Sequence, residues 1–399
     1  MYMIAVGIDV SKGKSTVAVL NEDGSIRVKP YEVLHTADQL RNLAKMFRTS
    51  PENAVIVLEP TGHYHYPILK VFRDASLPVC LVNPYLMKKY GDAQLRKAKT
   101  DKQDSLRLAR YALEKSASLV PYNAMDQKYE DLRFLSRQYG QRISTLTVCK
   151  VQLLNLLDET MPGITKVLPL RSYNPDKCVL LRFIKRFRSF DFIKKMGKTR
   201  FLDSYQVLIK KSKTHSSENK GLVIYELALD SVTTRGENPF IAMAQEQCID
   251  LIISSQRAAD EINLQMRTIS ETIPEYKVLR TMAGVGDRLG PVILAEIGDI
   301  RRFHSGKALN AYAGNDAPSY QSGQFESRNR HISKRGNPAL RKACFEVMQA
   351  LKMTKPQEDP VYLFLCKKEQ EGKPYKVAKM AAVNKFLRIY YARAMELYK

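Results

Sequence analysis

The sequence lacks any long hydrophobic run. No stretch approaches the roughly 18 uncharged apolar residues that predict a membrane-spanning helix. The N-terminal MYMIAVGIDVSK does not predict a secretory signal either, because Asp9 and Lys12 interrupt its apolar residues too early. We therefore expect a cytoplasmic protein without a membrane partner.

Cysteine is also sparse and unpatterned. The six cysteines form no CxxC pair and have no partner at short range. They lie at positions 80, 149, 178, 248, 344 and 366. This spacing excludes a disulfide framework or a zinc site as the organising feature, and it is typical of reduced thiols in a cytoplasm.

Acidic residues are few compared with basic ones. The 399 residues include 64 Lys and Arg against 41 Asp and Glu, which gives a net charge of +23. Such a surplus points to a polyanionic partner, and nucleic acid is the commonest one. A hydrophobic content of 44% with 26% charged residues excludes wholesale disorder. The length predicts two or three domains, each able to bury a core.

Hydrophobic periodicity and turn residues predict an α/β domain over residues 1–120. The expected strands are 4–10, 15–20, 25–28, 54–58 and 78–82, and the expected helices are 36–48, 65–75 and 101–116. The first three strands form an antiparallel meander, and helices then alternate with strands. This order is that of a ribonuclease H-like fold.

A coiled-coil region is expected over residues 121–275. Apolar residues recur in steps of three and four over 129–157 and again over 249–273, which predicts two long helices. They pair either antiparallel as a stalk or between chains. The segment 162–240 between them is basic and irregular in pattern, and we interpret it as an inserted subdomain that faces nucleic acid or carries a linker. A mostly α-helical third domain is expected over 276–399.

Four carboxylates are expected to meet at one edge of the N-terminal sheet. Asp9 ends the first strand and Glu59 follows the buried fourth strand, and these strands are neighbours in the expected fold. Asp101 and Asp104 share one helix face, although alone they would fit the helix dipole equally well. Converging carboxylates need a dication to neutralise them. Hard oxygen ligands favour Mg²⁺ or Mn²⁺, and two such ions suit phosphodiester chemistry.

The sequence EPTGHYHYP places His63 and His65 at a spacing seen in metal ligands. No third soft ligand is nearby in the sequence, which disfavours a metal site there. We interpret the two histidines as flanking the carboxylate site, where they hydrogen-bond or stack on a substrate base beside Tyr64 and Tyr66.

The third domain begins with a glycine turn between two helical stretches. Gly284 and Gly286 in AGVGDRLGP allow backbone N–H groups to approach a phosphate, as in a helix-hairpin-helix, although a tight αα-turn without a ligand fits equally well. A dense basic segment follows at 319–342, typical of phosphate binding. The candidate nucleic-acid contacts in it are Gly323, Arg328, Arg330, Lys334, Arg335, Arg341 and Lys342.

Ser322 precedes Gly323 within this basic segment. A serine held beside a phosphate is able to act as a nucleophile if its proton is removed and cations stabilise the phosphorane. On chemistry alone, however, an ordinary turn serine is the favoured interpretation of the Ser-Gly pair.

The motifs together resemble one insertion-sequence transposase family. GIDVSK, LEPTGHY and KTDKQD are similar to its DEDD (RuvC-like) catalytic domain, and AGVGDRLGPVILAEIGDIRRF, LNAYAGNDAPSYQSG and ISKRGNPALRKA are similar to its C-terminal transposase domain. The family includes the Piv-type DNA invertases and the bridge-RNA-guided recombinases. The resemblance covers residues 4–116 and 276–350. It departs from the compact members at the insert and in the extended C-terminal tail.

The resemblance implies a mechanism that spacing does not show. Asp9, Glu59, Asp101 and Asp104 hold Mg²⁺, and Ser322 is the nucleophile that becomes joined to DNA. The site is composite, with the serine of one subunit meeting the carboxylates of another, so a homo-oligomer (dimer or tetramer) is expected through the coiled coil. The implied partners are double-stranded DNA, as element ends and target, and a structured guide RNA. A nucleoid-associated prokaryotic location is also implied.

We therefore predict a DNA transposase or site-specific recombinase, either a transposase or an invertase in the cell. Two alternatives remain at this stage. A hydrolytic junction nuclease of the same fold requires the four carboxylates but not Ser322. A non-catalytic nucleic-acid-binding protein predicts salt-sensitive binding without a metal-dependent product.

Overall fold

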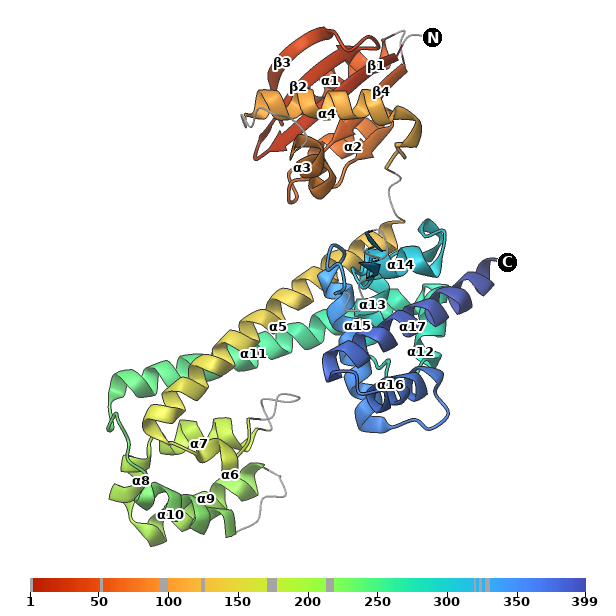
Figure 1. Cartoon of the computed structure of the whole chain (residues 1–399). Coiled ribbons are helices and arrows are strands. Elements are labelled where there is room, and N and C mark those ends of the chain that lie inside the picture. The colour runs from red at the N-terminus through yellow and green to blue at the C-terminus, as the bar shows by residue number, and fades with distance from the viewer. Residues whose placement is uncertain are drawn as a thin grey trace. The chain divides into compact units, whose positions relative to one another are not determined.

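The protein divides into two compact units, Met1–Ala124 and Met125–Lys399, in the computed structural model (Figure 1). The structure describes residues 3–50, 53–92, 100–122, 126–170, 178–212, 219–318, 321–322, 325–326 and 331–399. Each unit has its own hydrophobic core, so each is considered by itself.

The first unit contains a five-stranded mixed sheet in the order β3-β2-β1-β4-β5. Its strands are β1 (Met3–Ser11), β2 (Lys14–Asn21), β3 (Ile26–Leu34), β4 (Asn53–Leu58) and β5 (Val79–Leu81). Its helices are α1 (Ala37–Arg48), α2 (Tyr66–Asp74), α3 (Pro84–Asp92) and α4 (Asp101–Lys115). The first three strands are antiparallel, whereas β1, β4 and β5 are parallel. The predicted adjacency of the first and fourth strands is confirmed, and the order is consistent with the predicted ribonuclease H-like fold.

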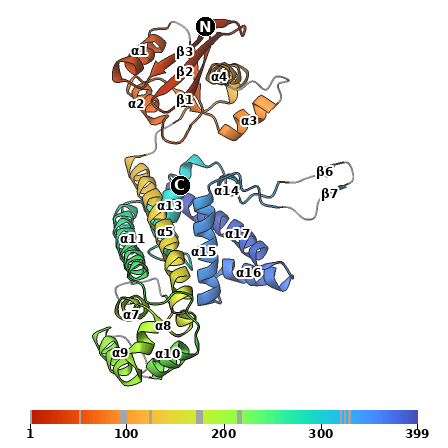
Figure 2. The ribbon, with the colours of Figure 1, turned by 90° about the vertical axis from the view of Figure 1, so that its left-hand side faces the viewer.

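Helices cover both faces of this sheet. Side chains of β1 alternate between the faces, so Ile4, Val6 and Ile8 pack with α1 and α2, whereas Ala5 packs with α4. Figure 2 shows α1 and α2 on one side of the sheet and α4 on the other. The alternation therefore determines whether each residue of β1 lies on the side of α1 and α2 or on the side of α4.

Strand β3 is longer than the sequence predicts. It extends to Leu34, although the expected strand ends at Val28. Pro30 interrupts the pattern there, but β3 lies at the edge of the sheet, where a residue without an N–H group is tolerated. The ladder with β2 is also irregular between Val17 and Leu20, which obscures the alternation from the sequence.

The two longest helices of the second unit are α5 (Gln127–Thr160) and α11 (Pro239–Glu271). They pack side by side and antiparallel within one chain (Figure 1). Thr160 at the end of α5 meets Gln245 near the start of α11, and Leu132 shares a core with Met266. Pairing within the chain is thus the arrangement that these two apolar stripes adopt.

The insert between the long helices, which the sequence pattern did not assign to helices or strands, is helical wherever the structure describes it. It consists of α6 (Ile164–Val167), α7 (Val179–Phe187), α8 (Phe190–Met196), α9 (Lys198–Ser212) and α10 (Asn219–Asp230). Aromatic rings fill its core, with the Phe187 and Phe201 centroids 5.1 Å apart. The helices are short and separated by turns, so the long apolar periodicity that marks α5 is missing.

Helices also form the remainder of the second unit. They are α12 (Pro274–Thr281), α13 (Leu289–Ile297), α14 (Gly306–Tyr312), α15 (Pro338–Thr354), α16 (Pro360–Gln370) and α17 (Tyr375–Met395). A two-stranded antiparallel sheet, β6 (Gln321–Ser322) and β7 (Phe325–Glu326), lies between α14 and α15 in the chain. Among the described helices, none has the length and apolar character required to cross a membrane.

Candidate functional site

Asp9 and Glu59 lie at the same edge of the sheet and on the same face. The last paired residues of β1 and β4 in the parallel ladder are Ile8 and Leu58, so Asp9 and Glu59 each follow at the next position. Asp9 alternates with Ile8, which packs toward α1 and α2, and Glu59 stands in the same relation to Leu58. Asp9 and Glu59 therefore both lie on the face of the sheet that α4 covers.

Helix α4 crosses this face directly over Gly7. A Cβ atom at Gly7 would lie 2.1 Å from the Ser105 carbonyl oxygen and 2.3 Å from the Ala109 nitrogen, so only glycine allows this approach. Gly7 precedes Asp9 by two residues and shares its face. The sequence analysis missed this role of Gly7, although the glycine within GIDVSK was the available signal.

The start of α4 lies at the carboxylate edge. Leu113 near its end packs close to Gly24, beyond the end of β2, whereas Asp101 at its start acts electrostatically on Lys14. Lys14 pairs with Ser11 at the end of β1, two residues beyond Asp9. The helix thus runs opposite to β1, and its first turn lies at the end of the strand that carries Asp9.

Thr100 caps this first turn, because its hydroxyl accepts a hydrogen bond from the Gln103 N–H at 3.2 Å. Asp101 and Asp104 precede the buried residues Ser105 and Leu108 by one turn each, so they continue the sheet-facing stripe of α4. The structure therefore places the backbone of all four predicted carboxylates at one edge of one sheet face.

Asp104 is already engaged within its own helix. Its carboxylate accepts a hydrogen bond from the Arg107 guanidinium at 2.6 Å, and both side chains are about four-fifths buried. The Arg107 Nε atom is buried without a hydrogen-bond partner among the described residues, and its guanidinium packs beside Gly91 of α3. The sequence analysis missed Arg107, whose signal is its position three residues after Asp104.

The donor set at this edge consists of carboxylates, which suit a hard divalent cation. Within the described residues, no three His, Cys, Asp or Glu side chains are gathered closely enough to hold a metal ion. The backbone positions thus fit a metal site, whereas the side chains need rotamer changes to form it. The pairing of Asp104 with Arg107 is one contact that such a change must break.

His63 and His65 lie in the turn after β4, next to Glu59. Each ring is tilted against the tyrosine that follows it, with centroids 4.5 Å apart for His63 and Tyr64, and 4.4 Å apart for His65 and Tyr66 at the start of α2. Burial lowers the pKa of His65, which favours its neutral form. The role beside a substrate base that the sequence analysis gives these histidines stays a prediction.

Ser322 lies in β6, where its backbone pairs with Phe325 of β7. We call residues 313–337, which include this hairpin, the serine arm. Its described flanks, residues 313–318 and 331–337, form the root of the arm. Gly323, Arg328 and Arg330 lie outside the described residues.

Backbone hydrogen bonds close the root of the serine arm. The Lys334 N–H donates to the Gly314 carbonyl at 3.0 Å, and the Ser333 N–H donates to the Asp316 carbonyl at 2.7 Å. The Ser333 hydroxyl also donates to the Asp316 carboxylate at 2.5 Å. A Cβ atom at Gly336 would lie 2.1 Å from the Tyr312 carbonyl oxygen, so the two sides of the root are in direct backbone contact.

A buried carboxylate anchors this root to the helices. Glu296 of α13 accepts hydrogen bonds from Ser136 at 2.9 Å, from Arg137 at 2.8 Å and from Asn337 at 2.7 Å. Asn337 also caps α15 by accepting from the Leu340 N–H. The sequence analysis missed this network, whose signal is a single acid inside the apolar run VILAEI.

The basic residues near the arm have different surroundings. Arg341 donates to the Ala313 carbonyl at 2.7 Å and so holds the root, whereas Lys342 is exposed with Glu346 at 3.9 Å. Lys334 is exposed and has a positive φ of 54°. Arg335 is also exposed, and its N–H donates to the Ser333 hydroxyl. Of the described predicted cations, Arg341 thus has an evident structural role.

The predicted glycine turn joins α12 to α13. Gly284 has a φ of 78°, and a Cβ atom there would lie 3.0 Å from the Val347 carbonyl oxygen, so it packs against α15. A Cβ atom at Gly286 would meet no neighbour within 4 Å. Arg280 donates to the Val285 carbonyl at 2.9 Å and pairs with Asp287 at 2.7 Å. The turn is therefore internally braced, and Gly286 is its open position.

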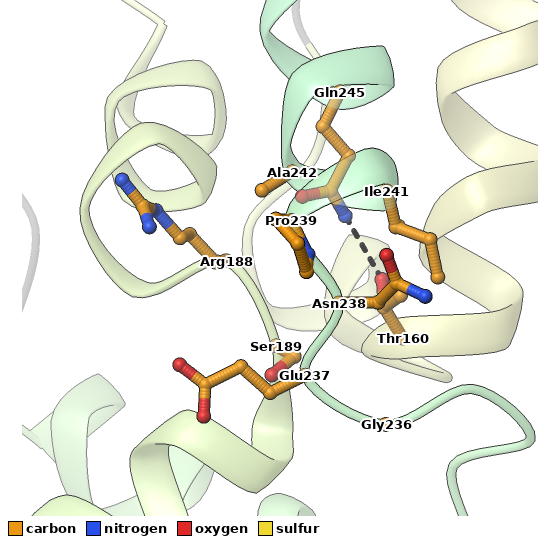
Figure 3. Close-up of a pocket in the computed structure, with 10 residues that line it drawn as sticks. All are labelled: Thr160, Arg188, Ser189, Gly236, Glu237, Asn238, Pro239, Ile241, Ala242 and Gln245. Atoms are coloured by element: carbon orange, nitrogen blue, oxygen red, sulfur yellow. Dashed lines mark hydrogen bonds between the residues drawn. The ribbon is translucent and has the colours of Figure 1, made fainter.

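A separate cavity of about 310 Å³ lies where the insert meets the start of α11 (Figure 3). The Gln245 amide donates to the Thr160 hydroxyl at 3.0 Å on its wall. Arg188 reaches it from the end of α7, and Glu237 reaches it from the segment before α11. One carboxylate and one guanidinium are too few for a metal site, so we assign this cavity to the packing of the insert.

Comparison with known proteins identifies the class. Residues 6–162 match a transposase family, the DEDD transposase of IS110 elements, and residues 276–363 match the family described as "Transposase IS116/IS110/IS902 family". The first range contains the four carboxylates, and the second contains Ser322. The chain is therefore a transposase, a class of enzyme that cleaves and rejoins DNA. It carries both transposase domains of the IS110/IS116 family.

The names of three similar curated proteins refer to insertion elements, transposition or gene inversion. The "Insertion element IS110 uncharacterized 43.6 kDa protein" of Streptomyces coelicolor is 25% identical over 73% of this chain and 70% of the relative. The "Mini-circle putative transposase for IS117" of the same species is 22% identical over 96% of this chain and 91% of the relative. The "Pilin gene-inverting protein" of Moraxella bovis is 34% identical, but over only 29% of this chain and 35% of the relative.

Proposed function

We propose that this transposase moves an insertion element by a two-part mechanism, in which Ser322 is the nucleophile and four carboxylates supply the metal site. The observation that carries the proposal is the convergence of Asp9, Glu59 and the first turn of α4 at one sheet edge. All of these positions lie in the range matched by the DEDD family. The strand order of the sheet supports a ribonuclease H-like (RuvC-like) fold for this part.

Asp9, Glu59, Asp101 and Asp104 would hold Mg²⁺ or Mn²⁺ in this proposal. The bound metal neutralises charge that develops on the phosphate during strand exchange. The residues of the chain prepare the site before that: Gly7 lets α4 approach the sheet, and Thr100 fixes its first turn. Release of Asp104 from Arg107 then supplies its carboxylate to the edge.

Ser322 performs the covalent step. Its hydroxyl oxygen forms a bond to a backbone phosphorus while the bond from that phosphorus to one bridging DNA oxygen breaks. A carboxylate of the edge accepts the hydroxyl proton, and the departing DNA oxygen takes up a proton. Rejoining is the reverse reaction, with a DNA hydroxyl as the nucleophile and the serine oxygen as the leaving group. No oxidant or nucleotide cofactor is consumed.

The partners we propose are double-stranded DNA, a structured guide RNA and further copies of this chain. The net charge of +23 supports binding of polyanions, and residues 162–240 contribute 16 Lys and Arg against 7 Asp and Glu. Large apolar side chains on the outer faces of the paired helices support an oligomer in which one subunit supplies the serine and another the carboxylates. These side chains are Phe134, Val148, Val151, Leu251 and Leu264.

A denaturing gel for protein–DNA adducts tests this proposal. The full chain is combined with DNA that carries intact element ends and flanking RNA-encoding sequence, in the presence of Mg²⁺. We expect a covalent adduct with the wild type and with the neighbouring-serine controls Ser319→Ala and Ser327→Ala, but none with Ser322→Ala. An adduct that survives Ser322→Ala overturns the role of this serine. Free nicked DNA from both wild type and Ser322→Ala establishes the hydrolytic nuclease instead.

A further inference from the structure

A large groove beside the root of the serine arm is not explained by the steps above. It has a volume of about 1240 Å³, and α17 forms one side of it, with the root and parts of α15 and α16 forming the remainder. Small-molecule sites typically occupy about 300–1,000 Å³, so this groove has room for a segment of a larger ligand. We call it the α17 groove.

The α17 groove carries positive charge along its length. Lys334 lies at the arm root, and Lys376, Lys385 and Arg388 lie on α17. Among the described residues that line it, none is acidic. Lys379 of the same helix does not line the groove: it is fully buried, and its ammonium donates to the Tyr375 hydroxyl. This arrangement is complementary to a chain of phosphates.

The groove also has an aromatic and apolar wall. Phe345 of α15 and Phe364 of α16 line it, together with Val377 and Met380 of α17. The Lys385 ammonium lies 4.9 Å from the Phe364 ring centroid, so a cation and an aromatic ring are neighbours in this wall. This combination is typical of single-stranded nucleic acid binding, where phosphates meet cations and base faces stack on rings. In a duplex the base faces are stacked on one another, so they are not available to stack on the rings of this wall.

The position of the groove indicates which nucleic acid it holds. Lys334 lines the groove and also closes the arm root through its hydrogen bond to the Gly314 carbonyl. The hairpin that extends from this root contains Ser322, and in the proposed function the strand that meets Ser322 is DNA. The groove therefore adjoins the two segments, 313–318 and 331–337, from which the hairpin with Ser322 extends.

We propose that the α17 groove binds a single strand of the DNA substrate next to the point of cleavage. This inference rests on the proposed function for the identity of the strand. Helix α17, residues 375–395, lies beyond the family match, which ends at residue 363, so the groove depends on a part of this chain outside the matched domain. It separates one strand from its duplex by offering stacking and charge that the duplex cannot use.

Fluorescence anisotropy of a labelled oligothymidylate with the full chain tests this site without requiring cleavage. The groove variant is Lys385→Gln with Arg388→Gln. The matched control is Lys128→Gln with Lys277→Gln, two exposed lysines on α5 and α12 that give the same net charge. We expect the groove variant to lose about tenfold in affinity and the control to lose less than about twofold. Equal losses in both overturn the groove and leave only net charge.

Phe364→Leu tests the stacking wall, because it keeps an apolar side chain and removes the ring. We expect it to weaken oligothymidylate binding about fivefold or more, and to leave duplex binding unchanged. Unchanged oligothymidylate binding overturns the single-strand assignment. Oligouridylate binding that falls more than oligothymidylate binding assigns the groove to RNA and overturns the DNA assignment.

The same assay separates this inference from the proposed function. Ser322→Ala is expected to bind oligothymidylate like the wild type. If no adduct forms through Ser322 but the groove variants still lose binding, the nucleophile fails and the groove stands. If the adduct forms normally and the groove variants bind normally, the groove fails and the nucleophile stands.

Discussion

The two candidate halves of the transposase site are held by different kinds of structure. Asp9 lies near the end of β1, Glu59 follows the neighbouring parallel strand β4, and α4 packs against the sheet at Gly7, so the hydrophobic core fixes the backbone of this half. Ser322 instead lies in a two-residue strand, and its link to the helices passes through the root of the serine arm. The core of the first unit therefore holds the carboxylate half directly, whereas the serine half is connected to the core of the second unit through the root of the serine arm.

This difference separates what each half requires from its surroundings. In the proposed mechanism the carboxylate half needs side-chain movement, such as the release of Asp104 from Arg107. The root of the serine half is held through Asn337, because the buried Glu296 carboxylate accepts hydrogen bonds from Asn337 and from Ser136 and Arg137 of α5. The proposed reaction, which joins the protein to DNA and later releases it, would require a positioned metal site and a nucleophile on a separate segment.

The largest expected effect is on the chemistry of the carboxylate half. Asp9→Asn keeps the shape of the side chain and removes its charge, so we expect strand cleavage to fall by about 100-fold or more. Single-turnover cleavage of labelled element-end DNA measures it, with thermal unfolding as a check on folding. Asp38→Asn, at an exposed position of α1, is the matched control. Normal cleavage by Asp9→Asn would remove Asp9 from the site.

Gly7→Ala tests whether the core positions this half. The added methyl group meets backbone atoms of Ser105 and Ala109 at 2.1 and 2.3 Å, so α4 must move away from the sheet. We expect a loss of about 2–3 kcal/mol in the free energy of unfolding of the first unit. Metal binding should weaken as well, because Asp101 and Asp104 move with α4.

Gly140→Ala is the control for this substitution. Gly140 is exposed in α5, and a Cβ atom there meets no neighbour within 4 Å, so alanine should stabilise the helix by about 0.5–1 kcal/mol. Denaturant unfolding with manganese titration measures both variants. A Gly7→Ala variant of normal stability would mean that α4 is not pressed against the sheet at this point.

Glu296→Gln tests the attachment of the serine half. The substitution removes the charge that Arg137 and Asn337 contact, and we expect a loss of about 1–3 kcal/mol in the stability of the second unit. Adduct formation through Ser322 should fall, while manganese binding by the carboxylate half stays normal. Glu346→Gln, whose carboxylate is 3.9 Å from Lys342, is the control. A parallel loss of metal binding would contradict the separation of the two halves.

The sequence predicts the carboxylate half better than the serine half. Strand ends, parallel pairing and the i, i+3 spacing of Asp101 and Asp104 are local rules, and they place all four acids at one edge. Gly7 and Arg107 were missed because a close approach and an ion pair depend on which element packs on which. The Glu296 network was missed for the same reason, since it joins residues about 160 positions apart. The short helices of the insert were missed because each shows too few turns to establish a period.

The smallest expected effect comes from substituting Arg107. This substitution tests whether the ion pair with Asp104 hinders or helps metal binding by the carboxylate half. Arg107→Met keeps an apolar side chain and removes the guanidinium, which pairs with Asp104 at 2.6 Å and packs beside Gly91. Exposed ion pairs contribute about 0.2–1 kcal/mol, and this pair is more buried, so its loss should tighten manganese binding at least about two- to fivefold. Arg110→Met, on an exposed position of the same helix, should leave binding unchanged. Weaker binding by Arg107→Met would show that the arginine orients Asp104 toward the metal. The carboxylate half would then be a preformed site, and the contrast with the serine half would be sharper still.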